Sequence, residues 1–200
     1  MSVLRLTGVG FTLNGQGEVD PDGENVPLSL QAQLDADDLS VFSALSGLQL
    51  GGGASVDLDL SAEALSGAFD LTLDGRTQDL SLGIDQVDPL LTGSTLLQLE
   101  ADRDETGLRV SDLSLQNEAI DVDGSADLTS DGGTAELEAR IDDLNRIDPS
   151  LSGPATLTAS ARRPADEWRI DLSFEGAEAA VAGDATIREL DAESPLAIFD

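Results

Sequence analysis

Carboxylates are the only side chains abundant enough in this sequence to suggest chemistry. The 200 residues include 40 Asp and Glu against 10 Lys and Arg, and they contain neither histidine nor cysteine. A Ser-His-Asp triad, a histidine general base and zinc sites with Cys or His ligands are therefore excluded. The chemistry that remains is calcium binding, or acid–base work by paired carboxylates.

Two acidic turns have spacing that suggests calcium ligands. Asp20-Pro21-Asp22-Gly23 and Asp121-Val122-Asp123-Gly124 each place two carboxylates beside a glycine. Calcium takes about six to eight oxygen ligands, and an EF-hand loop ends on a bidentate Glu at its twelfth position. That position is Gln31 counted from Asp20, and Gly132 counted from Asp121. We therefore interpret both segments as solvated hairpin turns and expect no metal site.

No other motif distinguishes a functional carboxylate from the many that simply lie in solvent on the surface. Asp37-Asp38, Asp142-Asp143 and the pair Asp57 and Asp59 lack the surrounding residues of a known catalytic site. Gly51-Gly52-Gly53 lacks the Gly-Lys-Ser/Thr ending of a phosphate loop, so it predicts a turn or bulge. The formal net charge of −30 disfavours nucleic acid as a partner. We expect no enzyme activity and no cofactor.

The dominant pattern is the alternation of apolar and polar residues. Trp168, Ile170, Leu172 and Phe174 alternate with Arg169, Asp171 and Ser173, and many other segments repeat this period of two. Such alternation is typical of antiparallel strands with one solvated face. Asp-Gly and Gly-Gly turns separate the runs, which are short. The sequence predicts an all-β chain of short strands in an elongated antiparallel meander.

The chain also repeats itself. Val87–Gly93, which reads VDPLLTG, matches Ile147–Gly153, which reads IDPSLSG. Ile141, Leu144 and Ile147 are three residues apart, so a short helical or 3₁₀ turn is expected at this junction. The expected organisation is a partial repeat (residues 1–37), three full repeats (38–84, 85–141 and 142–187) and a last segment, 188–200, that is either the start of the next repeat or a truncated end.

The Asp-Pro-x-Leu-Ser/Thr-Gly junctions and segments such as 65–75 resemble TamB, the translocation and assembly module family. TamB belongs to the AsmA-like, bridge-type lipid transport proteins. The resemblance covers nearly the whole chain, most clearly residues 38–187. It implies a long β-sheet curled into an open hydrophobic trough, with an inner-membrane anchor and a periplasmic location in a Gram-negative bacterium. It also implies a TamA-type barrel partner in the outer membrane, and a role in phospholipid transport or protein assembly there.

The chain shows neither a signal peptide nor an apolar run long enough for a spanning helix, so we expect a fragment whose anchor lies elsewhere. Phospholipid acyl chains are the expected ligand, and the TamA-type partner is expected to bind outside this fragment. The residues expected to line the groove are Val56, Leu58, Leu60, Leu71, Leu73, Leu80, Leu82, Leu157, Trp168, Ile170, Leu172, Phe174 and Val181.

Three other functions remain open. The first is a secreted or surface β-solenoid, an adhesin or scaffold with a closed, dry core. The second is an outer-membrane β-barrel, disfavoured by the absence of Tyr, the single Trp and the short runs. An enzyme is the third and weakest.

Overall fold

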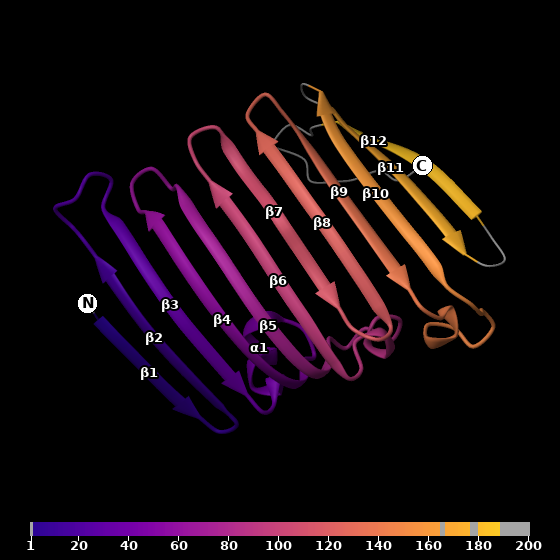
Figure 1. Cartoon of the computed structure of the whole chain (residues 1–200), viewed down its shortest axis with the longest axis horizontal. Helices are drawn as coiled ribbons and strands as arrows, with labels where there is room; N and C mark the ends of the chain where they lie inside the picture. Colours follow the sequence, from indigo (N-terminus) through magenta and orange to yellow (C-terminus); the bar gives the residue numbers. More distant parts are fainter. Residues whose placement is uncertain (1, 165–166, 177–179, 189–200) are drawn as a thin grey trace.

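The computed structural model describes residues 2–164, 167–176 and 180–188, and the described chain is all-β. Every described strand belongs to one antiparallel sheet, and each pairs with its neighbours in the sequence (Figure 1). The strands are β1 (Ser2–Gly8), β2 (Phe11–Val19), β3 (Pro27–Ala36), β4 (Gly51–Glu63), β5 (Phe69–Ser81), β6 (Ser94–Arg103), β7 (Gly107–Gln116), β8 (Ile120–Thr129), β9 (Gly132–Ile141), β10 (Ala155–Pro164), β11 (Glu167–Gly176) and β12 (Ala180–Arg188). The antiparallel meander expected from the alternation is confirmed.

The strands are longer than the sequence pattern predicts. They run from 7 residues in β1 to 13 in β4 and β5, so the expectation of short strands is wrong. Small residues extend the alternation beyond the large apolar ones. In β8, for example, Gly124 and Ala126 continue the face that begins with Ile120 and Val122.

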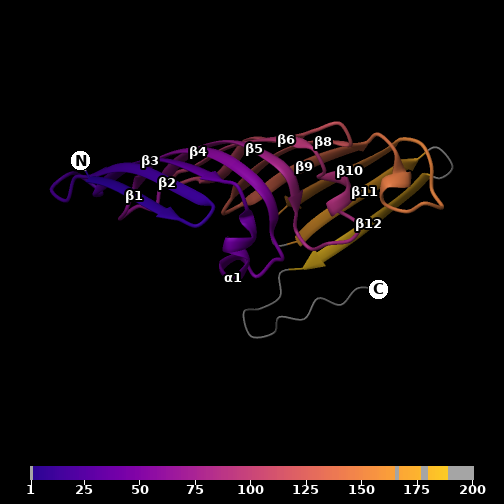
Figure 2. The ribbon, with the colours of Figure 1, turned by 90° about the horizontal axis from the view of Figure 1, so that it is seen from below.

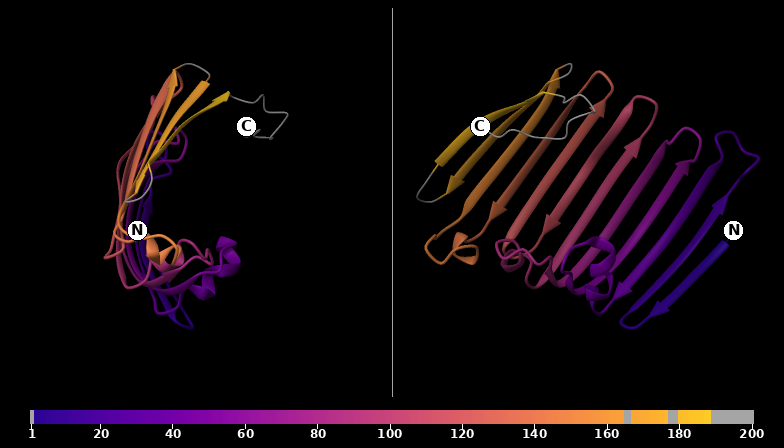
Figure 3. Two further views of the ribbon diagram at one scale, coloured as in Figure 1. Left: turned by 90° about the vertical axis from the view of Figure 1, so that its right-hand side faces the viewer. Right: turned by 180° about the vertical axis from the view of Figure 1, so that it is seen from behind.

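The two long edges of the sheet are built differently. One, the hairpin edge, carries the turns at residues 20–26, 64–68, 104–106 and 130–131. The other, the junction edge, carries the connections 9–10, 37–50, 82–93, 117–119 and 142–154. The helical elements all lie in this second set: η1 (Leu39–Phe42), α1 (Ser43–Ser46), η2 (Asp88–Leu90) and η3 (Leu144–Arg146). Figure 3 shows them at one edge of the sheet, on its inner side.

The sheet is a single curved layer that does not close on itself. Within the described residues, β1 pairs only with β2 and β12 only with β11. The views in Figures 2 and 3 show the sheet arched, with α1 beneath the arch. Eleven strand spacings of about 4.8 Å give the sheet a length of roughly 53 Å. The expectation of an all-β, curled sheet is therefore met.

The junctions contain the short helical turns that the sequence predicts, because η3 occupies Leu144–Arg146 within the triplet of apolar residues three apart. In the other copy of the motif, η2 lies on the Asp-Pro-Leu sequence itself. The boundaries at residues 38, 85 and 142 fall in these connections. The division of the chain into repeats stays a prediction.

Among the described residues, no helix combines the length and the apolar character needed to cross a membrane, and α1 has only 4 residues.

Candidate functional site: the concave apolar face

Side chains at alternate positions of the strands form one continuous apolar face. The pairing register joins them into rows that run across the strands, along the length of the sheet. One row consists of Leu6, Leu13, Leu34, Val56, Gly75, Leu97, Leu115, Val122, Ala139, Leu157, Phe174 and Val181. The next consists of Leu4, Gly15, Ala32, Leu58, Leu73, Leu99, Leu113, Gly124, Leu137, Ala159, Leu172 and Gly183. The third runs from Gly17 through Leu30, Leu60, Leu71, Ala101, Val110, Ala126, Ala135 and Ala161 to Ile170. No position in these three rows is polar.

The opposite face is polar, and its charged side chains are mainly acidic. Its central row contains Arg5, Asn14, Gln33, Asp57, Asp74, Gln98, Ser114, Asp123, Glu138, Thr158 and Ser173. Side-chain hydrogen bonds cross the strands here, as where Gln31 donates to Asp59 over 2.7 Å and Gln98 donates to Asp74 over 3.0 Å. Arg140 pairs with Glu138 at 2.6 Å.

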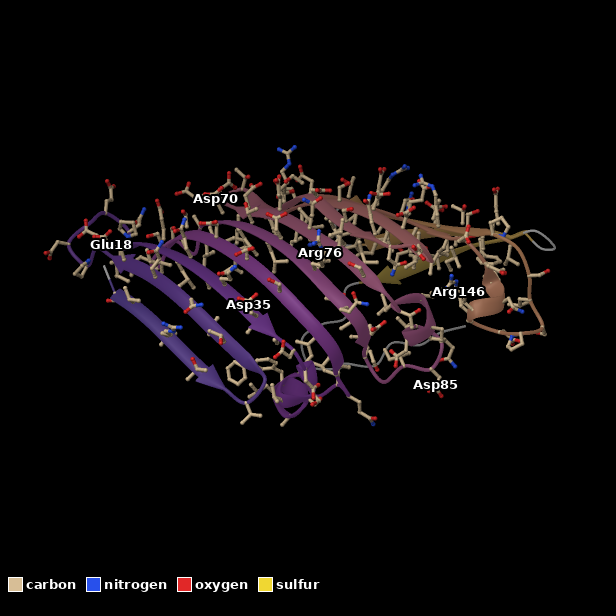
Figure 4. All side chains as sticks on the ribbon, turned by 60° about the horizontal axis from the view of Figure 1, so that its bottom comes forward. Glu18, Asp35, Asp70, Arg76, Asp85 and Arg146 are labelled. Atoms are coloured by element: carbon tan, nitrogen blue, oxygen red, sulfur yellow. The ribbon has the colours of Figure 1, made fainter. Side chains whose placement is uncertain are left out.

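The apolar face is the concave one. Figure 4 shows polar side chains standing on the outer side of the arch, with Asp70 near the hairpin edge and Asp85 and Arg146 at the junction edge. The junction elements fold onto the inner side, where Phe42 of η1 lies against Phe11, with ring centroids 5.1 Å apart. Phe11 pairs with Ala36 and so belongs to the apolar face.

This face is only partly covered by protein: it is most exposed in the strands at the two ends of the sheet, whereas its residues in β4–β9 are half-buried or, at Ala139, buried. Leu172 is 45% exposed, Leu4 58% and Val181 63%. The whole chain exposes 13145 Å², whereas a compact protein of 20.7 kDa exposes about 8,900 Å². Full burial of a leucine side chain contributes roughly 1.5–3 kcal/mol, so a half-exposed leucine leaves about 1 kcal/mol unrealised. The face would therefore gain stability from an apolar occupant.

The buried core lies along the junction edge instead. The described apolar residues that are fully buried are Ala36, Leu90, Leu91, Ala119, Ala139, Leu144 and Ala155. Leu90 and Leu144 come from η2 and η3, which lie against the inner side of this edge. Asn117 connects η2 to β6 through hydrogen bonds. Its Nδ2 donates to the Leu90 carbonyl oxygen at 2.8 Å and to the buried Thr95 hydroxyl at 2.9 Å. The junctions thus close one side of the concave face.

A local hollow interrupts the concave face between β7 and β11. Its volume is about 270 Å³, and its apolar lining includes Val110, Leu113, Leu137 and Ile170. Its floor is low because glycine and alanine, such as Gly124, leave space where neighbouring rows carry leucine. An apolar cavity of about 150 Å³ already holds a molecule the size of benzene. This hollow is large enough for part of a hydrocarbon chain.

A larger hollow of about 710 Å³ lies mainly on the polar face of β7–β12, and its carboxylates include Asp123, Glu136 and Asp171. Within the described part of the chain, no group of three or more His, Cys, Asp or Glu side chains is arranged to hold a metal ion. We therefore take the concave face, not this acidic surface, as the candidate site.

Aspartates at the junctions hold the connections in shape. Asp38 and Asp143 cap η1 and η3 by accepting from the backbone N–H groups of Ser40 and Asn145. Asp88 is the most heavily used, because its two carboxylate oxygens accept from the backbone N–H groups at residues 82, 83 and 84 and from the hydroxyl at residue 81. The acidic junction residues therefore have a structural role that the sequence motif alone does not reveal.

These hydrogen bonds lower the pKa of the junction aspartates. The pKa of Asp88 is lowered chiefly by the N–H donated from Leu82, with partial burial opposing the shift, and the pKa of Asp38 and Asp79 is lowered for the same kind of reason. A folded-state pKa below the unfolded value contributes stability above the unfolded value of about 4, and this is lost as the pH falls through the folded value. The protein should therefore lose stability below about pH 4.

Replacing Asp88 with alanine should destabilise the protein at neutral pH, because three backbone N–H groups and one hydroxyl lose their acceptor. The difference from the wild type should be smaller at about pH 3 than at neutral pH, because below about pH 4 the carboxyl of the unfolded state takes up a proton before that of the folded state does. The control is Asp85→Ala, an exposed carboxylate in the same connection. Thermal unfolding followed by circular dichroism at both pH values measures this. An equal loss of stability in Asp88→Ala and Asp85→Ala would contradict the role of Asp88. So would a difference in stability between Asp88→Ala and the wild type that is the same at both pH values.

Ten of the thirteen residues predicted to line a groove lie in the three apolar rows: Val56, Leu58, Leu60, Leu71, Leu73, Leu157, Ile170, Leu172, Phe174 and Val181. Trp168 is two residues before Ile170 on β11 and pairs with Ile187. Leu80 lies in the bulge near the end of β5, between the paired residues Gln78 and Ser81, and Leu82 lies in the connection that follows. Contact of any of them with lipid stays a prediction.

The predicted set omits much of the face. It contains no residue of β1–β3 or β6–β9, although Leu30, Leu99, Leu113 and Leu137 lie in the same rows. The alternation of apolar and polar residues in those segments would have identified these leucines as members of the same face. The glycine and alanine positions give a weaker signal, because these small residues do not stand out as apolar in the alternation even though they occupy the same face.

No protein-family model, curated protein or solved structure was found to match this chain.

Proposed function

We propose that the chain is a stretch of a lipid-carrying trough, in a periplasmic protein that spans the envelope and supplies phospholipid to the outer membrane or assists protein assembly there. The observation that carries this proposal is the run of apolar rows across the whole sheet with no covering layer over them in the described residues. The expected inner-membrane anchor and TamA-type partner belong to the same proposal, through the resemblance of the junction motifs.

The chemistry of the face suits acyl chains. Aliphatic side chains make no hydrogen-bond demands, so they offer a smooth wall to a hydrocarbon tail of any length. The rows run perpendicular to the strands, along the roughly 53 Å length of the sheet. An acyl chain can therefore move along the sheet without crossing a polar side chain. The mechanism is passive, and no residue performs a reaction.

A closed β-solenoid with a dry core is the competing function. It needs a second apolar surface over the concave face, and none lies there in the described residues, where Leu4 and Leu6 of β1 are at least half exposed. The open layer favours the trough over the dry scaffold.

Position-specific photo-crosslinking separates the two functions. A crosslinking residue at Leu172 faces the concave side, whereas one at Asp171 faces the convex side. When the chain is incubated with phospholipid vesicles, the trough predicts lipid adducts at 172 and not at 171. Adducts at neither position in a folded protein would favour the scaffold.

A further inference from the structure

The two edges of the concave face offer a lipid very different surroundings. At the junction edge, η2 and η3 fold onto the inner side, and Leu90, Leu91 and Leu144 are buried there. At the hairpin edge, the described turns are short and carry no helical element. This inference rests on the proposed function: if acyl chains occupy the concave face, their polar head groups emerge at the hairpin edge.

The turns of the hairpin edge are acidic. We define the lip as residues 19–27, 63–69, 103–107, 129–132 and 163. Its acids are Asp20, Asp22, Glu24, Glu63, Asp104, Glu105 and Asp131. Its two basic residues are Arg103 and Arg163, so the formal charge of the lip is 2 − 7 = −5. The lip is part of a chain whose formal net charge is −30.

The two arginines differ from the acids in depth and in face. Arg103 pairs with Phe69 on one side and Leu108 on the other, so its position belongs to the apolar face. Arg163 pairs with Gly133 on the same face. Arg103 is exposed and forms no ion pair with any described residue. Arg103 is the last residue of β6 and Arg163 is the last but one of β10, so both lie beside the apolar rows at the hairpin edge, whereas most of the lip acids lie farther out, in the turns.

Going outward from the apolar rows, a positive arginine therefore comes before the negative carboxylates of the turns. One class of lipid carries the complementary charges in the same sequence. In a zwitterionic phospholipid the phosphate lies next to the acyl chains and the ammonium lies beyond it. An arginine guanidinium binds phosphate oxygens through paired N–H donors. A phosphate at Arg103 would direct the ammonium outward, toward the carboxylates of the turns. An anionic lipid has no cation to offer those carboxylates, and the field of the chain repels it.

We infer that the concave face selects phospholipids with a zwitterionic phosphate–ammonium head group over phospholipids with a net negative charge, and that Arg103 and the acidic lip make the selection. Charges in exposed turns are screened by salt over about 10 Å at 0.1 M. The selectivity is therefore greatest at low ionic strength.

The test uses vesicles with equal amounts of phosphatidylethanolamine and phosphatidylglycerol. The 200-residue chain is incubated with them and re-isolated, and the lipid that it carries is extracted and measured by mass spectrometry. We expect severalfold enrichment of phosphatidylethanolamine at low salt, falling toward the vesicle ratio at high salt. Enrichment of phosphatidylglycerol, or a bound ratio equal to that of the vesicles at low salt, would overturn the inference and leave the proposed function standing. Absence of bound lipid would contradict the proposed function itself.

Matched variants distinguish the lip from the net charge. The triple variant Glu24→Gln, Glu105→Gln, Asp131→Asn removes three charges from the lip, and it should lose most of the enrichment. The control triple Asp57→Asn, Glu136→Gln, Asp171→Asn removes three charges from the middle of the convex face and should keep the enrichment. Arg103→Gln should lower the amount of phosphatidylethanolamine bound. Equal effects of the two triples, or full binding by the Arg103 variant, would contradict the assignment to the lip.

Discussion

If acyl chains occupy the concave face as we propose, replacing Leu99 with aspartate will remove the lipid, and it will destabilise the protein by about 2 kcal/mol. Leu99 lies in the middle of the sheet, between Leu73 of β5 and Leu113 of β7. A carboxylate at this position would interrupt the apolar rows and desolvate a charge against any acyl chain that passed over it. Lipid content after purification and chemical denaturation measure the two effects.

The control for this experiment lies three residues away on the same strand. Leu96 is on the convex face, is 43% exposed, and pairs with Arg76 and Gln116. Leu96→Asp introduces the same side chain, next to a cation and away from the apolar rows. We expect its lipid content to match the wild type and its stability to change by less than about 0.5 kcal/mol. Equal loss of lipid in both variants would mean that added charge, rather than the concave face, governs binding.

Replacing Gly52 with alanine will destabilise the protein by about 3 kcal/mol, combining left-handed backbone strain with overpacking. Gly52 has a φ of +86°, and a Cβ atom there would lie 2.3 Å from the carbonyl oxygen of Asp79. The register shift between β4 and β5 occurs here, because Asp79 and Leu80 of β5 lie opposite Gly52 alone, so the extra residue of the bulge is in β5. Urea denaturation of the purified variant measures the loss.

The bulge matters because it directs Asp79 into the junction. The Asp79 backbone N–H donates to the carbonyl oxygen of Gly93 at 2.8 Å, and the Asp79 carboxylate accepts from the Gly93 N–H at 2.9 Å. Gly67→Ala is the control, since Gly67 has a φ of +74° but a Cβ atom there would meet no other atom within 4 Å. It should lose only about 1 kcal/mol from backbone strain. Similar losses for Gly52 and Gly67 would contradict the close approach of β4 to Asp79.

The alternation of residue types predicts much of this fold. The stripe Ile170, Leu172 and Phe174 alternates as a strand must, and the structure puts all three on one face of β11. The triplet around Leu144 predicts η3, and the Gly51-Gly52-Gly53 segment predicts the bulge. Each of these signals is local, because it depends only on how a few consecutive residues orient their side chains.

Long-range features could not be predicted in this way. Pairing brings Gly124 and Ala159 to either side of Leu137, and this register creates the apolar hollow. Leu96 and Leu97 are adjacent leucines of one strand and so point to opposite faces, but only the pairing shows that Leu97, opposite Gly75, belongs to the apolar face and that Leu96, opposite Arg76, does not. The four hydrogen bonds to Asp88 depend on how the connection folds back, which the Asp-Pro motif does not specify. The alternation of large apolar residues underestimates the strand lengths, because glycine and alanine also belong to the apolar face.

The most direct test of the central claim is lipid crosslinking at two strands that lie far apart in the sheet. Crosslinking residues at Leu58 of β4 and Leu172 of β11 face the concave side, and their neighbours Asp57 and Asp171 face the convex side. If the concave face is one lipid-carrying surface, vesicle phospholipid will be captured at 58 and 172 and not at 57 and 171. Capture at all four positions, or at none in a folded protein, would contradict this account.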